Sequence, residues 1–487
     1  MPGLESHLVI RFLLPLFMIL GHLSLLGATQ LITAAHLTIH RRGGALADRE
    51  PANLTQLVDL LHDVERRYSR VKREVKGNKL VRSWRARSTG ATNDEQLLAE
   101  PGKEGRWYTN LPVGPQPNTI EVDLDMLSPD FYTVQTTSGK GSQYNVFSET
   151  HVPNDARVHP LCKHPSDTIH LTDLKNTTSV TISLPMCSPS RSSRATLFKS
   201  GSVLGLSPSS SSSSSSLSRL DSPPLLQQLL SAELLTDDIF SLTLLDSTSG
   251  ILSLGGTLAR QAEEASTRTQ VEMDSIGDPA ATTETISGKV NDRLAATFPA
   301  DIEDQYRWAP IRGAAEGWWT TLLPGLWING LKMLKNQPVL LDIQSPFILA
   351  PPLAARRIYE SIGGCSRLAV PYDMFWKFPC LNRPKIMLEF GGWFFPLMSS
   401  QGGHDEAVWG PGGGRLSLGK LSMGGNGTSS GYCVGRVVET RMGLQSREDI
   451  DWEGSGLRDV WVLGEPAFWG VGVVFDRQRQ RVGFRNY

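Results

Sequence analysis

Two segments of this chain repeat one pattern: an apolar, strand-like run ends in an aspartate, and two residues, a serine and a second apolar run follow. The segments are Val122–Val134 (VDLDMLSPDFYTV) and Leu340–Pro351 (LLDIQSPFILAP). Each is followed later by an apolar-apolar-glycine sequence, at Val203–Ser207 (VLGLS) and at Trp461–Glu465 (WVLGE). The repeat predicts two related halves, each with one aspartate at the end of a buried strand. Brought together, these aspartates would form an acid/base centre.

The sequence pattern from Trp107 onward is typical of an all-β protein, because short strand-like runs alternate with Gly-, Pro- and Ser-rich breaks. Leu225–Leu235 and Ala354–Ile362 are exceptions, with amphipathic patterns that predict short surface helices. The serine-rich segment 207–218 and the polar segment 259–305 are expected to be loops outside the core. A length of 487 residues is sufficient for two domains.

The first 105 residues differ from the rest. We interpret residues 1–28 as a secretory signal peptide, with an uncleaved membrane anchor as the alternative, because an apolar run precedes small residues there. Residues 29–105 form a basic leader, in which apolar residues at helical spacing predict a helix over Asn53–Val75. Residues 1–105 hold 15 Lys and Arg against 11 Asp and Glu, and the remainder holds 33 against 38. This balance argues against a nucleic-acid partner for the body.

The basic stretch of the leader, Arg66–Arg87, has two interpretations. It is either part of a propeptide that covers an acidic cleft until it is removed, or a solvated linker. The basic pairs Arg41-Arg42, Arg66-Arg67 and Lys72-Arg73 are candidate processing sites.

The region from Trp107 to Tyr487 resembles the pepsin-like aspartic proteases, because segments similar to those of the family occur in the family's order. These segments are Tyr108–Gln116, Val203–Ser207, Ile239–Gly256, Trp318–Gly330, Lys377–Gly392 with Tyr432–Cys433, and Val462–Phe484. The resemblance implies a mostly β, bilobal fold with two pseudo-symmetric β lobes and a cleft between them. The N-terminal β lobe would span residues 106–258 and the C-terminal β lobe residues 306–487.

The resemblance also implies a mechanism that needs neither a metal nor a cofactor. Two carboxylates about 3 Å apart cannot both ionise, so Asp125 and Asp342 would share a proton and activate a water molecule that attacks a peptide bond. Ser128 and Ser345 would hydrogen-bond the outer carboxylate oxygens. The implied enzyme is an endopeptidase acting on proteins or peptides.

The residues after the two aspartates depart from the family, which has threonine or serine and then glycine there. Here the pairs are Met126-Leu127 and Ile343-Gln344, which lack the hydroxyl that bonds across the lobes and place side chains in a crowded space. A non-catalytic protein that binds peptides or proteins is therefore the alternative function. The family's flap tyrosine has only Tyr144 as a candidate, and we expect Asp123 to be an exposed strand residue.

Five cysteines in a secretory chain suggest two disulfides and one free thiol. The resemblance implies a Cys380–Cys433 bond. For Cys162 and Cys187 a bond and two free thiols remain alternatives, and Cys365 is the odd cysteine. Sequons at Asn53, Asn176 and Asn426 predict glycosylation. We expect a secreted or vacuolar monomer without a metal site, and with no membrane contact beyond an N-terminal anchor.

Overall fold

In the computed structural model, the described residues are 35–42, 52–75, 106–113, 118–129, 131–134, 162–163, 166–172, 177–183, 186–187, 202–208, 224–235, 237–245, 248–256, 302–312, 318–382, 384–397, 416–423, 428–440 and 460–486. These residues form a mostly β fold, as the sequence predicted, and their strands belong to three sheets.

The largest sheet contains fourteen strands: β1 (Ala35–Arg41), β2 (Trp107–Val113), β3 (Asn118–Asp125), β4 (Phe131–Val134), β5 (Cys162–Lys163), β6 (Ser166–Thr172), β7 (Thr177–Ser183), β8 (Met186–Cys187), β9 (Val203–Gly205), β10 (Ile239–Leu244), β11 (Ser249–Leu254), β12 (Arg307–Pro310), β24 (Val471–Asp476) and β25 (Arg481–Asn486). Its main path is β12-β25-β24-β10-β11-β1-β2-β3-β9-β4-β8-β5, so C-terminal strands complete a sheet made mainly from the N-terminal half.

Two smaller sheets come from the C-terminal half. The seven-stranded sheet contains β13 (Thr320–Ile328), β14 (Leu331–Leu341), β15 (Ile348–Ala350), β18 (Ile386–Phe390), β19 (Trp393–Pro396), β22 (Val437–Glu439) and β23 (Trp461–Leu463). The four-stranded sheet contains β16 (Ser366–Arg367), β17 (Trp376–Pro379), β20 (Ser417–Met423) and β21 (Thr428–Gly435). The described helices are α2 (Leu54–Val75), α3 (Leu225–Ser231), α6 (Ile302–Gln305), α7 (Pro352–Ile362) and the 3-10 helix η7 (Glu465–Ala467).

The repeated aspartate segments form the same three-stranded unit twice. In the first unit, β9 pairs in parallel with β3 and antiparallel with β4, where Phe131 lies opposite Leu204. In the second, β23 pairs in parallel with β14 and antiparallel with β15, where Ile348 lies opposite Leu463. Phe131 and Ile348 occupy the same position after their aspartates, so the two units share one register.

The glycine of the second apolar-apolar-glycine sequence is needed because the chain is crowded there. A Cβ atom on Gly464 would lie 2.1 Å from the Phe347 carbonyl oxygen and 2.2 Å from that of Ser345. Only a residue without a side chain allows the strand after Asp342 to pass this close.

The predicted leader contributes a central strand to the largest sheet. Strand β1 pairs antiparallel with β11 on one side and with β2 on the other. Its apolar residues alternate, and Ala35, Leu37 and Ile39 point into the main core. A segment of the leader is therefore built into the fold.

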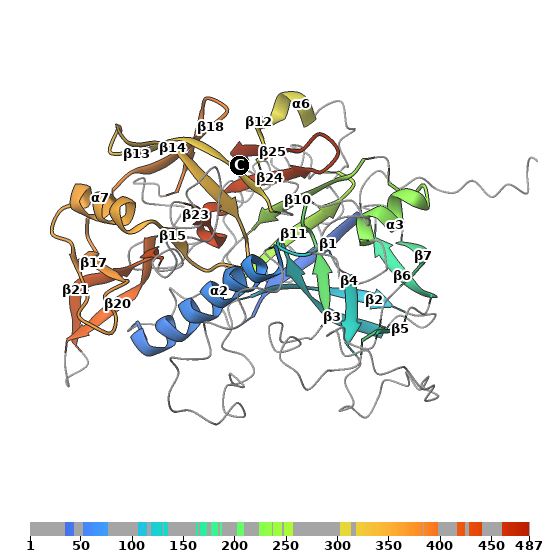
Figure 1. Cartoon of the computed structure of the whole chain (residues 1–487), viewed down its shortest axis with the longest axis horizontal. Coiled ribbons are helices and arrows are strands. Elements are labelled where there is room, and N and C mark those ends of the chain that lie inside the picture. Colours follow the sequence, from blue (N-terminus) through green and yellow to red (C-terminus); the bar gives the residue numbers. More distant parts are fainter. Residues whose placement is uncertain are drawn as a thin grey trace, which may run out of the picture.

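The helix expected in the leader is confirmed as α2. Asn53 caps it, since its Oδ1 accepts a hydrogen bond from the Gln56 backbone N–H at 3.1 Å. Its apolar side chains recur at helical spacing and bury one face in a cluster that joins both halves of the chain. Figure 1 shows α2 running between the strands around β3 and those around β15 and β20.

An aromatic group links the two halves of the chain in the main core. Phe240 of β10 stacks on Phe475 of β24, with ring centroids 4.7 Å apart. Trp319, just before β13, packs edge-on against both rings and is fully buried. This group fixes the start of the second aspartate hairpin on the largest sheet.

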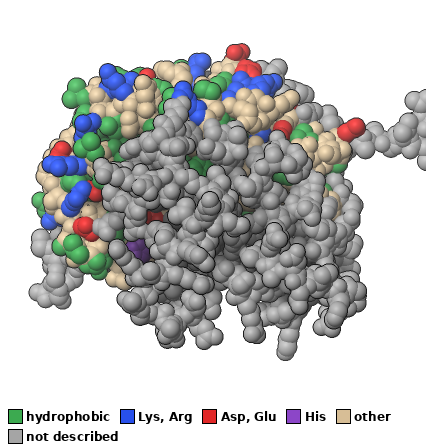
Figure 2. Space-filling model, viewed as in Figure 1, with side chains coloured by type: hydrophobic (Ala, Val, Ile, Leu, Met, Phe, Trp, Pro, Cys, Tyr) green, Lys and Arg blue, Asp and Glu red, His purple; other side chains and the backbone are tan. Residues whose placement is uncertain are grey.

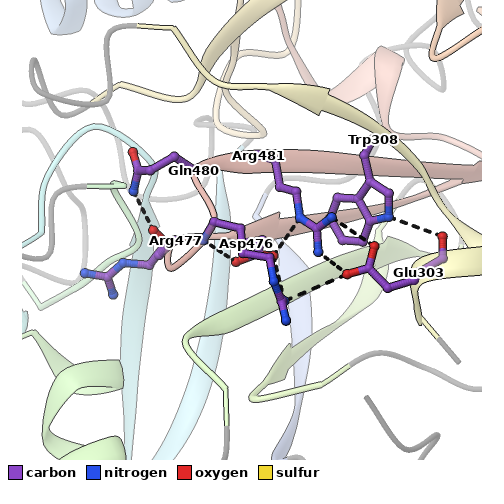
Figure 3. Close-up of polar contacts among 7 residues, drawn as sticks. Glu303, Trp308, Asp476, Arg477, Gln480 and Arg481 are labelled. Carbon is purple, nitrogen blue, oxygen red and sulfur yellow. Dashed lines mark hydrogen bonds and ion pairs between the residues drawn. The ribbon is translucent and has the colours of Figure 1, made fainter. Parts of the chain in front are cut away.

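The hairpin of β24 and β25 carries a network of charges at its turn (Figure 3). Asp476 accepts hydrogen bonds from Arg481 at 2.8 Å and from Arg479 at 3.2 Å. Arg481 also bonds Glu303 of α6 and lies 3.9 Å above the Trp308 ring. These hydrogen bonds hold the pKa of Glu303 below its usual value.

Other sequence predictions have mixed outcomes. The two short helices are confirmed as α3 and α7, although Leu225, Leu226 and Leu229 of α3 are buried. The Cys380–Cys433 disulfide is present, and Cys365 has a free thiol whose pKa burial raises to about 11. The register places Cys162 opposite Cys187, and their bond stays a prediction.

Several predictions lie outside the described residues. These are the signal peptide, most of the serine-rich and polar loops, Tyr144, Asn176 and Asn426. None of the described helices is long and apolar enough to cross a membrane. On the described surface in Figure 2, Lys and Arg side chains are interspersed with Asp and Glu. The proposed domain boundaries stay predictions.

Candidate active site

The two aspartates of the repeat occupy equivalent positions. Asp125 is the last residue of β3, and Asp342 directly follows β14. Both are buried, with 7% and 0% of their surfaces exposed. In each, Oδ1 accepts a 3.0 Å hydrogen bond from the backbone N–H two residues later, that of Leu127 in the first case and that of Gln344 in the second. The same local turn therefore holds both carboxylates.

The Gln344 side chain connects the second aspartate turn to the strands of the first. Its Nε2 donates to the Leu124 carbonyl oxygen at 2.6 Å and to the Trp107 carbonyl oxygen at 2.7 Å. Its Oε1 accepts from the Trp107 backbone N–H at 3.0 Å. Leu124 immediately precedes Asp125, so these bonds bring the two aspartate turns against each other.

A second contact joins the same parts of the chain. The Trp319 indole N–H donates to the Leu206 carbonyl oxygen at 2.6 Å. The Leu206 backbone N–H in turn donates to the Asp125 carbonyl oxygen at 2.7 Å. Trp319, which precedes the second aspartate hairpin, is therefore tied through Leu206 to the end of the strand that carries Asp125.

The phenol of Tyr68 contacts the second aspartate. Its hydroxyl donates to Asp342 Oδ2 at 2.8 Å, and the side chain is buried. Tyr68 belongs to α2, and no local motif distinguishes it from the other apolar positions of that helix. The leader helix therefore directly covers one of the two carboxylates.

The bulky residues that replace the family's small ones have defined positions. Met126 is buried in the main core. Leu127 lies in the apolar cluster of α2, with Leu61, Val64 and Tyr68. Together with Gln344, these side chains pack against the leader helix or between the halves, which explains how they fit beside the aspartates.

The expected role of Ser345 is not observed. Its hydroxyl donates to the Phe347 carbonyl oxygen at 2.9 Å, within the same turn. A serine hydroxyl has one proton, and this carbonyl receives it, so the predicted hydrogen bond from Ser345 to Asp342 is not made. The Ser345 backbone N–H donates to the Asp342 carbonyl oxygen at 3.0 Å instead. The role of Ser128 stays a prediction.

The expectation that Asp123 is exposed is wrong. Asp123 lies on the same face of β3 as Asp125, since the two are separated by one residue, and it is fully buried. Its charge is paired with Arg42, which also contacts Glu121 at 2.8 Å. The neighbouring Arg41 forms a buried ion pair with Glu465 at 2.7 Å.

The remaining polar groups of the region have simple roles. Asn53 is exposed at the start of α2, where it caps the helix. Within the described residues, no group of three His, Cys, Asp or Glu side chains is arranged to hold a metal ion. The chemistry available at this site is that of two carboxylates in a largely buried setting.

Comparison with known proteins gives one similar sequence and no matching family. No protein-family model matches the chain. An aspartic protease of Phaffia rhodozyma is 25% identical over 174 residues, which make up 35% of this chain and 34% of that protein. The chain thus spans about a third of the length of the relative it matches. Over that part, this chain is similar to an aspartic protease.

Proposed function

We propose that this protein is an aspartic endopeptidase made as an inactive precursor. A water molecule between Asp125 and Asp342 would lose a proton to the ionised carboxylate and attack the peptide carbonyl carbon. The protonated carboxyl would hydrogen-bond the carbonyl oxygen and then help to protonate the leaving amine. No metal or cofactor takes part in this mechanism.

The observation that carries the proposal is the equivalence of the two aspartates. Asp125 is the last residue of β3 and Asp342 directly follows β14, in units of the same register, and each carboxylate accepts the same backbone hydrogen bond. The hydrogen bonds of Gln344 hold the two turns against each other. This arrangement and the similarity to an aspartic protease support a pair of carboxylates that work together.

The contact of Tyr68 supports the precursor. While α2 is in place, the Tyr68 hydroxyl donates to Asp342 Oδ2, so the helix covers this side of the carboxylate. Opening or removal of α2 would uncover the aspartate. A bilobal cleft, entry into the secretory pathway, glycosylation at Asn53 and a monomeric state are parts of the same proposal.

A non-catalytic binding protein remains the alternative, and one observation favours it. The Leu127 side chain stands next to Asp125, in the apolar cluster that α2 covers. After release of α2, this cluster would present an apolar surface suited to a peptide. Cleavage assays separate the two functions.

The test is a cleavage assay on the full chain, before and after limited proteolysis of the leader. Unfolded protein substrates are incubated between about pH 3 and 6, where a carboxylate pair shares one proton. We expect cleavage by the processed wild type and none by Asp125→Asn or Asp342→Asn. Asp304→Asn, an exposed change on α6, serves as the control and should cleave like wild type. Wild-type cleavage no greater than that of the aspartate variants would refute the enzyme and favour binding.

A further inference from the structure

We infer that Gln344 is a positioning residue that sets the separation of the two aspartates. The inference rests on the proposed function, because it gives the side chain a role in a carboxylate pair. Gln344 lies two residues after Asp342 and is 2% exposed. It contacts neither carboxylate through its side chain in any hydrogen bond that the structure records, and its amide instead bonds only backbone groups of the other half.

Both the oxygen and the nitrogen of the Gln344 amide find suitable hydrogen-bond partners in the other half of the chain. The two carbonyl oxygens of Trp107 and Leu124 require donors, and the Trp107 N–H requires an acceptor. A primary amide supplies two donors and an acceptor in one plane. The opposite orientation of the amide would set its oxygen against two carbonyl oxygens, so only one orientation satisfies all three groups.

These bonds act on both aspartates at once. The backbone N–H of Gln344 holds Asp342 Oδ1, whereas its side chain holds the carbonyl of the residue directly before Asp125. The side chain is buried, so water cannot easily replace the bonds. A single residue therefore couples the orientation of one carboxylate to the place of the other strand.

From the sequence alone, a side chain at position 344 is expected to crowd the space beside the aspartates. The structure gives it the opposite role, because its amide fills that space with three hydrogen bonds between the halves. Met126 and Ile343 lack the hydroxyl that would bond across the lobes. The Gln344 amide, one position after Ile343, makes such a connection instead.

The test compares Gln344→Leu, which keeps the approximate size and loses all three hydrogen bonds, with Gln337→Leu in the processed protein. Gln337 is half-buried on β14 and lies away from the aspartate turns, so its variant controls for the loss of a glutamine in this hairpin. We expect Gln344→Leu to cleave on the order of a hundredfold more slowly, as a displacement of about 1 Å can cause. The control should stay within about threefold of wild type.

The pH profile separates positioning from a general loss of stability. Carboxylates that move apart interact less, so their two apparent pKa values converge. The bell-shaped profile of cleavage should therefore narrow in Gln344→Leu. The Gln344→Glu variant should regain cleavage activity in acid, where the new carboxyl is protonated and can donate a hydrogen bond. Its cleavage activity should fall as that carboxyl ionises. A pH profile of unchanged width in Gln344→Leu, together with no recovery of cleavage by Gln344→Glu in acid, would overturn the inference.

A structural measurement keeps the inference testable if the wild type does not cleave, an outcome that would refute the enzyme but leave the role of Gln344 open. Crystal structures of wild type, Gln344→Leu and Gln344→Glu would give the distance between the Cα atoms of Asp125 and Asp342. We expect it to grow by about 1 Å in the leucine variant. An unchanged distance in that variant, or in the glutamate variant at neutral pH if the leucine variant does not fold, would overturn the inference.

Discussion

The hydroxyl of Tyr68 gives a direct test of how firmly the leader helix covers the aspartates. Tyr68→Phe keeps the ring in the apolar cluster of α2 and removes the 2.8 Å hydrogen bond to Asp342. A hydrogen bond to a charged group contributes about 1.5–3 kcal/mol. If this bond exists only in the covered state, its loss should raise the ratio of open to covered molecules by roughly 10- to 150-fold.

Hydrogen–deuterium exchange measures this ratio without any need for activity. Amides of α2 exchange when the helix opens, so their exchange should accelerate by the same factor in Tyr68→Phe. Peptides from β10, in the middle of the largest sheet, should exchange as in wild type. The control is Tyr372→Phe, which removes a long 3.5 Å contact to Thr55 at the start of the helix. That variant should change exchange by less than about threefold.

Two results would refute this reasoning. Exchange of α2 within twofold of wild type would mean that the phenol contributes nothing to the covered state. An equal acceleration in α2 and β10 would mean that the substitution destabilises the whole protein rather than releasing the helix.

Two further predictions concern stability. Gly464→Ala should lower the free energy of unfolding, measured in urea, by about 3 kcal/mol or more, because the new Cβ would collide with the Ser345 carbonyl. Gly431 has open space around it, so Gly431→Ala should change the same free energy by less than about 0.5 kcal/mol. Glu303→Gln should cost at most about 1 kcal/mol at neutral pH, because its ion pair with Arg481 is partly exposed. The folded-state pKa of Glu303 is lowered, so its contribution to stability is present above the ordinary pKa of 4.5 and is lost as the pH falls through the folded-state pKa. The free energies of unfolding of Glu303→Gln and wild type should therefore become equal in acid. A difference in unfolding free energy that persists in acid would contradict this prediction.

The parts of the fold that the sequence predicted are those that depend on local patterns. The apolar spacing of α2 and of the short helix α7 could be recognised in the sequence, because residues three or four positions apart determine it. The Cys380–Cys433 bond followed from resemblance rather than from spacing.

The parts of the site that the sequence missed depend on residues far apart. In the sequence, Tyr68 is one more apolar residue of a predicted helix, and its partner Asp342 lies 274 positions later. Gln344 and Trp107 are 237 positions apart. From the sequence, Asp123 is expected to be exposed because the cation that neutralises it, Arg42, directly follows leader strand β1, whose pairing no local pattern predicts.

The place of β1 determines what proteolytic processing can achieve. Arg41 and Arg42 are buried at its end, so a processing enzyme cannot reach this dibasic pair while the strand is paired. A cut between α2 and β2 would break the covalent link between the leader and the rest of the chain. The pairing of β1 with β11 and β2, and the Arg41–Glu465 ion pair, would still hold the leader in place. The processed molecule would then consist of two chains that copurify, and α2 would act as a tethered inhibitor whose release is a reversible equilibrium.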